Sequence, residues 1–346
     1  MRKFILVIII LCLFTSSVSA MEFTAPEAPE SAEKYMPKDT ESFGEGLWSI
    51  IKSAIAQLQP SIAEAAGICL SLMAIILLVS MLQSFSSISK RTVELVSTLT
   101  IGILLIRPSN SLIQLGVQTV EELSEYGKLL LPVMTAAMAA QGGTTTSAAL
   151  YTGTALFNTL LTLGITKLII PMVYIYIALC VAHSALGEAI VKNLRDFIRW
   201  LMTWSLKIII YLFTGYIGIT GVVSGTTDAA AVKAAKLAIS GFVPVVGSII
   251  SDASEAILVS AGVMKNAAGL YGLLAILAVW IGPFLHIGIQ YILLKITSAV
   301  CSVFGCKESV SLIGDFSGVM GLLLAMTGTV CLLLLISTVC FMKGVS

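Results

Sequence analysis

Long uncharged runs, separated by short clusters of charged residues, dominate the pattern of this chain. These runs cover residues 65–89, 129–166, 168–187, 208–227, 266–294 and 316–342. A helix needs about 20 apolar residues to cross the roughly 30 Å hydrocarbon core of a bilayer. In lipid, its backbone polar groups must also be hydrogen-bonded within the segment. The pattern therefore predicts an all-α, polytopic integral membrane protein with seven to eight transmembrane helices.

The first 60 residues predict an exported N-terminus. Residues 1–20 read as a cleaved signal peptide: Arg2 and Lys3 precede an apolar stretch, and small residues at 18–20 form a cleavage site. The alternative is an uncleaved first span. Residues 21–60 form an acidic, proline-containing extracytoplasmic segment, and residues 43–58 within it have the apolar periodicity of a surface helix. The multispan membrane domain would then cover residues 61–346.

Basic residues predict the orientation of the first spans. Lys90 and Arg91 follow the run 62–84, so this span should end in the cytoplasm. A short return span over 92–106 would be closed by Arg107 and Pro108. The amphipathic stretch 110–127 then predicts an outer interfacial helix, and 129–141 a short membrane segment.

Two further spans are expected at 147–166 and 168–187, with Lys167 at a tight outer turn. A lysine left at the bilayer centre would cost about 2.5–3.5 kcal/mol on insertion scales, and a turn at the interface avoids that cost.

A second basic cluster predicts the orientation of the later spans. Lys192, Arg195 and Arg199 lie in the amphipathic stretch 188–201, which reads as a cytoplasmic helix before an outward span at 206–224. The last two spans are expected at 268–294 and 316–340. Lys343 would then lie outside, in mild conflict with the positive-inside rule.

Residues 212–264 are the candidate functional segment. Gly215, Gly218, Gly221 and Gly225 share one helix face, which would let another backbone approach closely. Gly241, Pro244 and Gly247 interrupt an uncharged run that is too short to span, so 237–251 is a candidate re-entrant hairpin that lines a path. A plain outer loop with a surface-dipping helix is the alternative, with the glycines serving packing alone.

Recognisable catalytic chemistry is absent from the sequence. It contains no nucleotide-binding glycine loop, zinc-protease motif or nucleophile elbow, so we expect no enzyme activity and no cofactor. Gly314 and Asp315 match half of an intramembrane aspartyl-protease motif, but no partner aspartate lies in a span. Cys301 and Cys306 lack the further ligands of a metal site. His183 and His286 are expected to be neutral and hydrogen-bonded to a neighbouring helix, with a functional role as the alternative.

Three stretches carry a family resemblance: TGYIGITGVVSGT at 214–226, AAKLAISGFVPVVGSIISDASEAIL at 234–258 and GVMKNAAGLYGLLAIL at 262–277. They resemble stage III sporulation protein AE of endospore-forming bacteria. The resemblance implies an integral membrane subunit of a channel or secretion complex between the mother cell and the engulfed forespore. It implies location in the mother-cell-derived membrane.

The resemblance also implies partners. These are the other stage III sporulation proteins encoded with it, which include a secretion-type ATPase and ring-forming proteins, and indirectly stage II sporulation protein Q. Two alternatives remain open from the residues alone. One is a stand-alone secondary transporter, although only the second half of the chain has a convincing broken segment. The other is an assembly scaffold without a conduit of its own.

Overall fold

The computed structural model describes residues 26–37, 42–85, 89–140, 144–219 and 267–343. Within these ranges every regular element is helical and no strand occurs, so the expected all-α class is confirmed. The elements are α2 (Glu30–Glu33), α3 (Phe43–Ala56), α4 (Gln59–Phe85), α5 (Lys90–Ala140), α6 (Thr144–Leu163), α7 (Ile170–Leu186), α8 (Ala189–Ile219), α11 (Ala267–Cys301) and α12 (Lys307–Lys343). The signal peptide and the segment 237–251, with Gly221, Gly225, Gly241, Pro244 and Gly247, lie outside the described residues.

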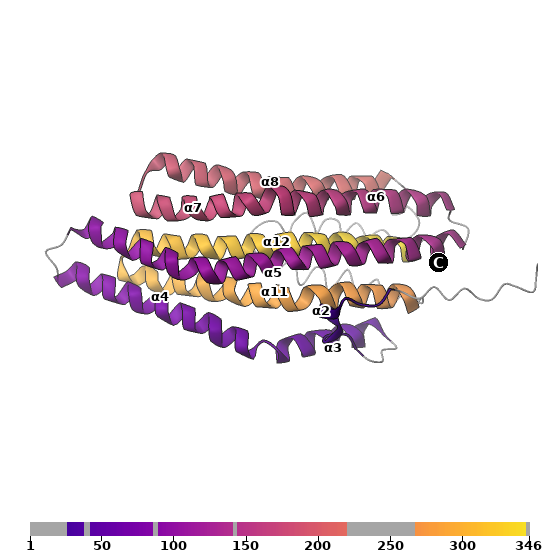
Figure 1. Cartoon of the computed structure of the whole chain (residues 1–346), viewed down its shortest axis with the longest axis horizontal. Coiled ribbons are helices and arrows are strands. Elements are labelled where there is room, and N and C mark those ends of the chain that lie inside the picture. The colour runs from indigo at the N-terminus through magenta and orange to yellow at the C-terminus, as the bar shows by residue number, and fades with distance from the viewer. Residues whose placement is uncertain (1–25, 38–41, 86–88, 141–143, 220–266, 344–346) are drawn as a thin grey trace, which may run out of the picture.

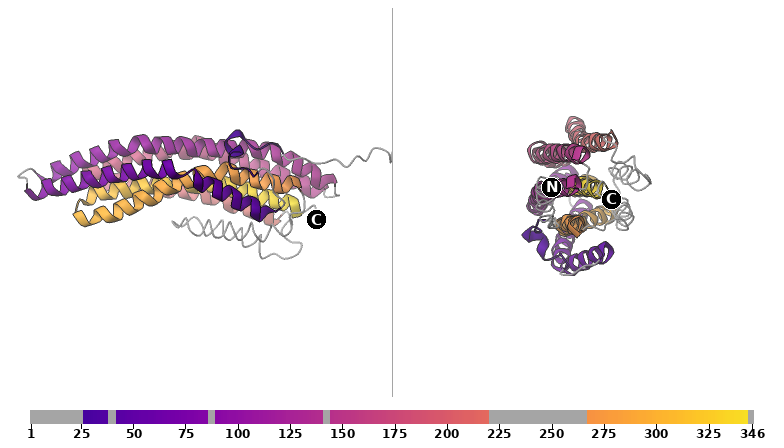
Figure 2. Two further views of the ribbon diagram at one scale, coloured as in Figure 1. Left: turned by 90° about the horizontal axis from the view of Figure 1, so that it is seen from below. Right: turned by 90° about the vertical axis from the view of Figure 1, so that its right-hand side faces the viewer.

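The helices form a long, gently curved bundle (Figures 1 and 2). α12 lies at its centre and packs against α11 and α5 most extensively, and also against α6, α7 and α8. The continuous helix formed by α6 and α7, together with α8, covers one side of this centre, whereas α4, α3 and α2 cover the other (Figure 1). The C-terminal ends of α4, α7 and α11 all lie at one end of the bundle (Figure 1).

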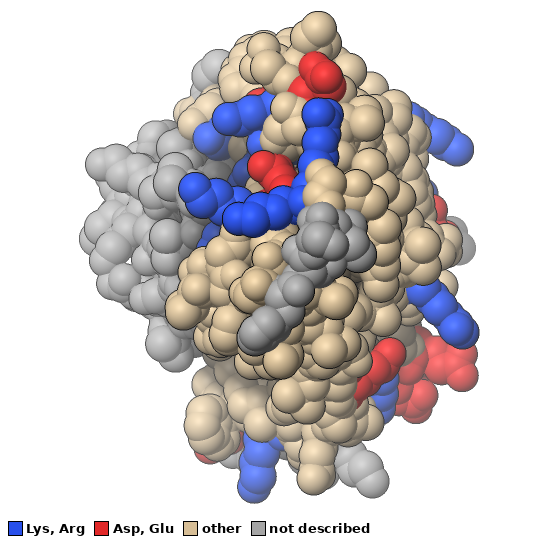
Figure 3. All heavy atoms as spheres, turned by 90° about the vertical axis from the view of Figure 1, so that its left-hand side faces the viewer, with Lys and Arg blue, Asp and Glu red and all other residues tan. Residues whose placement is uncertain are grey.

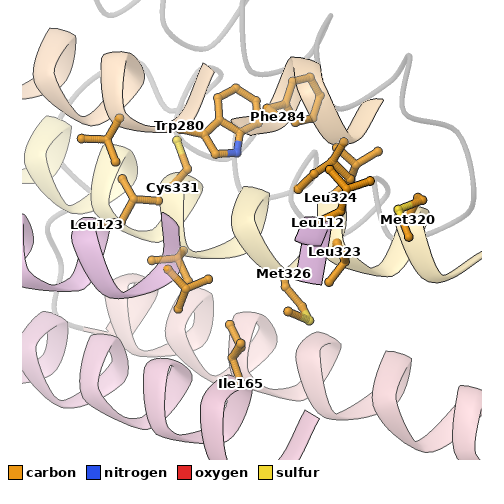
Figure 4. Close-up of a cluster of buried hydrophobic side chains, with 14 of the residues drawn as sticks. Leu112, Leu123, Ile165, Trp280, Phe284, Met320, Leu323, Leu324, Met326 and Cys331 are labelled. Carbon is orange, nitrogen blue, oxygen red and sulfur yellow. The ribbon is translucent and has the colours of Figure 1, made fainter. Parts of the chain in front are cut away.

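Interlocking apolar side chains fill the core between the central helices (Figure 4). The rings of Trp280 and Phe284 on α11 have centroids 4.2 Å apart. Leu112 of α5 and Leu323 of α12 are buried beside them. Since lipid is as apolar as these side chains, tight packing rather than water exclusion must hold such helices together.

Six helical segments of the described residues are long and apolar enough to cross a membrane. They are Gln59–Ser84, Lys90–Met138, Ser147–Leu186, Ala189–Gly218, Ala268–Phe304 and Lys307–Met342. Four predicted elements are confirmed as helices, at 43–58, 62–84, 268–294 and 316–340. The expected count of seven to eight spans is not confirmed by the described part of the chain.

The expectation of three separate elements over 92–141 is wrong. One continuous helix, α5, runs through Arg107 and contains both Pro108 and Pro132. A proline inside a helix removes one backbone hydrogen bond and can bend the helix without ending it. The apolar face of 110–127 is covered by the bundle, because Leu112, Val120 and Leu123 are buried. This stretch is therefore part of the bundle and not an interfacial helix.

The tight turn expected at Lys167 is also wrong. α6 continues into α7 through a π-helical stretch, Gly164–Ile169, and Lys167 lies exposed on its surface. An extra residue per turn there rotates the helix face without breaking the chain's direction. Similarly, 188–201 and 206–219 are one helix, α8. The sharp change of direction comes earlier, at Gly187, whose φ of 71° lies in the left-handed region that favours glycine.

Candidate functional site

A polar cleft lies between α4, α5 and α11, halfway along the bundle. It consists of two adjoining cavities of about 390 and 320 Å³. Ser61, Leu115, Gln118 and His286 line both cavities, which joins them into one depression. Cavities of this size are typical of small-molecule sites in proteins. The cleft is therefore a candidate site among the described residues.

The walls of the cleft offer hydrogen-bonding groups in an otherwise apolar bundle. Those of the larger cavity are Ser61 and Glu64 on α4, Ser111, Gln114 and Gln118 on α5, and His286 and Gln290 on α11. These amides and hydroxyls can both donate and accept, whereas the Glu64 carboxylate accepts. The described residues contain no group of three His, Cys, Asp or Glu placed to hold a metal ion. The arrangement suits binding of a polar group or a partner's backbone.

The N-terminal segment 26–37 forms one wall of the smaller cavity. Ser31, Lys34 and Tyr35 line it together with Glu122 of α5. The Ser31 hydroxyl donates a hydrogen bond to Glu122, at 2.5 Å. Residues 26–37 of the acidic segment thus pack against the bundle.

Two tyrosines extend this contact. Tyr271 of α11 receives a hydrogen bond from the Ala28 backbone N–H at 3.3 Å, and the Tyr126 hydroxyl donates to the Pro26 carbonyl oxygen at 3.4 Å. Tyr35 itself is buried, and its ring rests on Gly282 of α11. The segment is therefore fastened to both α5 and α11.

Gly282→Val is expected to release the segment 26–37 from the bundle. A Cβ at position 282 would come within 2.6 Å of the Tyr35 hydroxyl oxygen, so the Tyr35 ring could not keep its position against α11. Limited proteolysis in detergent should then cleave near residues 26–37 faster than in the parent protein. Gly288→Val on the same helix is the control, because no described atom lies within 4 Å of a Cβ there. Equal cleavage rates for both variants would contradict this role for Gly282.

A second polar centre lies nearer the end of the bundle that carries Lys90 and Lys307. Arg195 of α8 and Asp315 of α12 are both buried and form an ion pair, with Nη1 and Oδ2 2.8 Å apart. Arg195 also pairs with the half-exposed Asp196 at 2.9 Å. Gly318, one turn along α12, leaves room for Arg199 and Tyr176 beside the pair. The missing side chain at Gly318 thus makes room for this polar centre.

Three further polar atoms near this pair lie on α7. The Tyr176 hydroxyl, His183 Nδ1 and the Ser184 hydroxyl are buried and have no hydrogen-bond partner among the described residues. The hydrogen bond expected for His183 is therefore not found at Nδ1. His286 lies instead on the wall of the cleft, where both cavities reach it.

The glycine candidates are brought neither to the cleft nor to the ion pair. Gly215 and Gly218 lie exposed on α8, and no described atom would come within 4 Å of a Cβ at either position. Any partner of this face lies outside the described residues, and a packing or pore-lining role stays a prediction.

Sequence reasoning missed Glu64, Gln114 and Gln118 as residues of the cleft. The signal for Gln114 and Gln118 was the run of polar residues at helical spacing on one face of 107–128.

Comparison with known proteins places these features in a family. The family model of stage III sporulation protein AE matches residues 33–344 of this chain. The chain is also similar to stage III sporulation protein AE of Bacillus subtilis (strain 168), with 20% identity over 220 residues. That match covers 64% of this chain and 55% of the relative, so it spans about half of the relative's length. No solved structure matches.

Proposed function

Because this chain belongs to the stage III sporulation protein AE family, we propose that it is a membrane subunit of a sporulation-specific channel or secretion complex. The complex would join the mother cell to the engulfed forespore and support late forespore development. The family match over residues 33–344 is the observation that carries this proposal. Six helical segments able to cross a membrane are consistent with an integral subunit.

The proposed mechanism is passive. The chain supplies a packed helical platform and a polar cleft, while a separate secretion-type ATPase supplies energy. The other partners would be ring-forming stage III sporulation proteins encoded with it, and indirectly stage II sporulation protein Q. The subunit would lie in the mother-cell-derived membrane, with its mature N-terminus outside the cytoplasm.

Purification from sporulating cells tests the proposal. An affinity-tagged chain, crosslinked before solubilisation, should retrieve the other stage III proteins, and deletion of its gene should stop late forespore gene expression. The purified chain alone in vesicles should move no solute. Solute uptake by those vesicles, without retrieval of the stage III proteins, would instead identify a stand-alone transporter.

A variant in the cleft tests whether the proposed assembly uses this surface. Gln118→Leu removes an amide that both cavities share, whereas Gln83→Leu changes an amide on α4 outside them. We expect Gln118→Leu to lower retrieval of the stage III partners several-fold at unchanged membrane abundance, and Gln83→Leu to leave retrieval unchanged. Wild-type retrieval by both variants would exclude the cleft as a contact surface.

A further inference from the structure

The exposed face of α5 changes from apolar to polar at one point. Between its basic first turn, with Lys90 and Arg91, and residue 106, the exposed large side chains of α5 are all apolar: Leu95, Val96, Leu99, Ile103 and Ile106. After that point, the same face carries only polar exposed side chains as far as residue 128: Arg107, Asn110, Ser111, Gln114, Gln118, Glu121, Glu125 and Lys128. A continuous helix whose exposed face is first apolar and then polar passes from lipid into water.

Three other helical segments carry a charged residue about as far from their own end as Arg107 lies from the start of α5. We call Glu64 of α4, Arg107 of α5, Lys167 between α6 and α7, and Lys207 of α8 the charged belt. At 1.5 Å per residue, each lies about 25–31 Å from the end of its helix nearest Lys90 and Lys307. That length matches the thickness of the hydrocarbon core.

The end of the bundle below this belt is basic. Figure 3 views it directly and shows Lys and Arg side chains gathered there. Lys90, Arg91, Lys192 and Lys307 lie in the first turns of their helices. Arg199 and Lys295 lie a few turns deeper, where long side chains can extend toward the interface. The positive-inside rule assigns such an end to the cytoplasm.

Beyond the belt, protein rather than lipid covers the apolar parts of the central helices. Residues 273–280 of α11 are all buried, and α3 packs along this helix. α3 begins at a Ser42 cap and exposes Glu45 and Lys52 on its outer side. The apolar runs of α11 and α12 thus extend past the length a bilayer needs, because they form the core of the bundle.

We infer that the bilayer surrounds only the basic half of the bundle, up to the charged belt. The other half, which carries the polar cleft and the segment 26–37, stands in water outside the cytoplasm. The cleft is then open to extracytoplasmic partners and is not a lipid-facing groove. This placement does not depend on the proposed function.

Cysteine labelling along α5 tests the placement. Single cysteines replace Leu99, Ile103, Gln118 and Glu125 in the full chain, which is expressed in non-sporulating cells so that its extracytoplasmic side faces the medium. The intact cells are treated with a membrane-impermeant maleimide. The parent protein supplies the background, because its six described cysteines are buried. Maleimide needs a hydrated thiolate, so positions 118 and 125 should label about tenfold faster or more than 99 and 103. Labelling after denaturation in SDS corrects for protein amount.

Two further positions complete the test. Ser89→Cys, at the basic end, should label in inside-out vesicles and stay protected in intact cells. Thr159→Cys, beyond Lys167 on α6, should label from outside although Leu156 and Leu160 are exposed beside it. Equal labelling rates along α5, protection of both 118 and 159, or labelling of position 89 from outside would each overturn the placement.

Discussion

Replacing Asp315 with alanine is expected to destabilise the folded bundle by about 3–5 kcal/mol. The change leaves the Arg195 guanidinium buried without its nearest compensating charge, since both side chains of the pair are only 11% exposed. Arg195 then keeps only the half-exposed Asp196 as a partner, and removing one side of a buried pair costs more than the net value of the pair itself. Thermal unfolding in detergent, followed by circular dichroism, should show a much lower melting temperature.

Asp196→Ala is the matched control for this loss. Asp196 accepts hydrogen bonds from the same guanidinium at 2.9–3.0 Å, but its side chain is 51% exposed. An exposed ion pair contributes about 0–1 kcal/mol, so this variant should melt close to the parent. The double variant Arg195→Leu/Asp315→Leu removes both charges and should recover most of the stability. Equal losses for Asp315→Ala and Asp196→Ala would contradict the assignment.

Gly153→Ala on α6 is expected to destabilise the bundle by about 1–3 kcal/mol. A Cβ at position 153 would overlap Cε1 and Cζ of the Tyr216 ring, which contacts this glycine. The ring cannot move away freely, because its hydroxyl donates a 2.6 Å hydrogen bond to the Ala149 carbonyl oxygen. Displacing the Tyr216 ring would break that hydrogen bond, which adds about 1 kcal/mol to the loss of stability. The same thermal unfolding measurement applies.

A glycine without neighbours gives the opposite expectation. Gly67→Ala on α4 meets no described atom within 4 Å and should stabilise its helix by about 0.5–1 kcal/mol, because alanine has the higher helix propensity. Combining Gly153→Ala with Tyr216→Ala removes the clash, so the two losses should not add. Additive losses in that double variant would show that Tyr216 is not the group that position 153 accommodates.

The long apolar runs were sufficient to predict the helices that the bundle buries most. α11 and α12 were expected at 268–294 and 316–340, and the structure has both as helices that extend beyond these bounds. The surface helix expected at 43–58 is α3, although it packs on α11. In each case the period and length of the apolar pattern were strong enough to identify the element.

Connections were predicted less well than helices. The charge pattern predicts that a membrane element ends at each of three places: Arg107 with Pro108, Lys167, and the basic cluster at 192–199. Each lies inside a continuous helix. The assumption behind these errors was that a charge must leave the bilayer by a turn. A bundle that is longer than the bilayer lets the helix itself carry the charge into water.

The all-α, membrane-spanning character follows from the sequence alone, because long apolar runs satisfy their backbone in lipid as helices. The family follows from the resemblance of the stretches at 214–226, 234–258 and 262–277, and from the family match over residues 33–344. Tertiary structure decided which polar residues meet. Arg195 and Asp315 are 120 positions apart in sequence. Tyr35 contacts Gly282, although most of the chain separates them in sequence. Such contacts depend on which helices are neighbours, and hydropathy carries no information about neighbours.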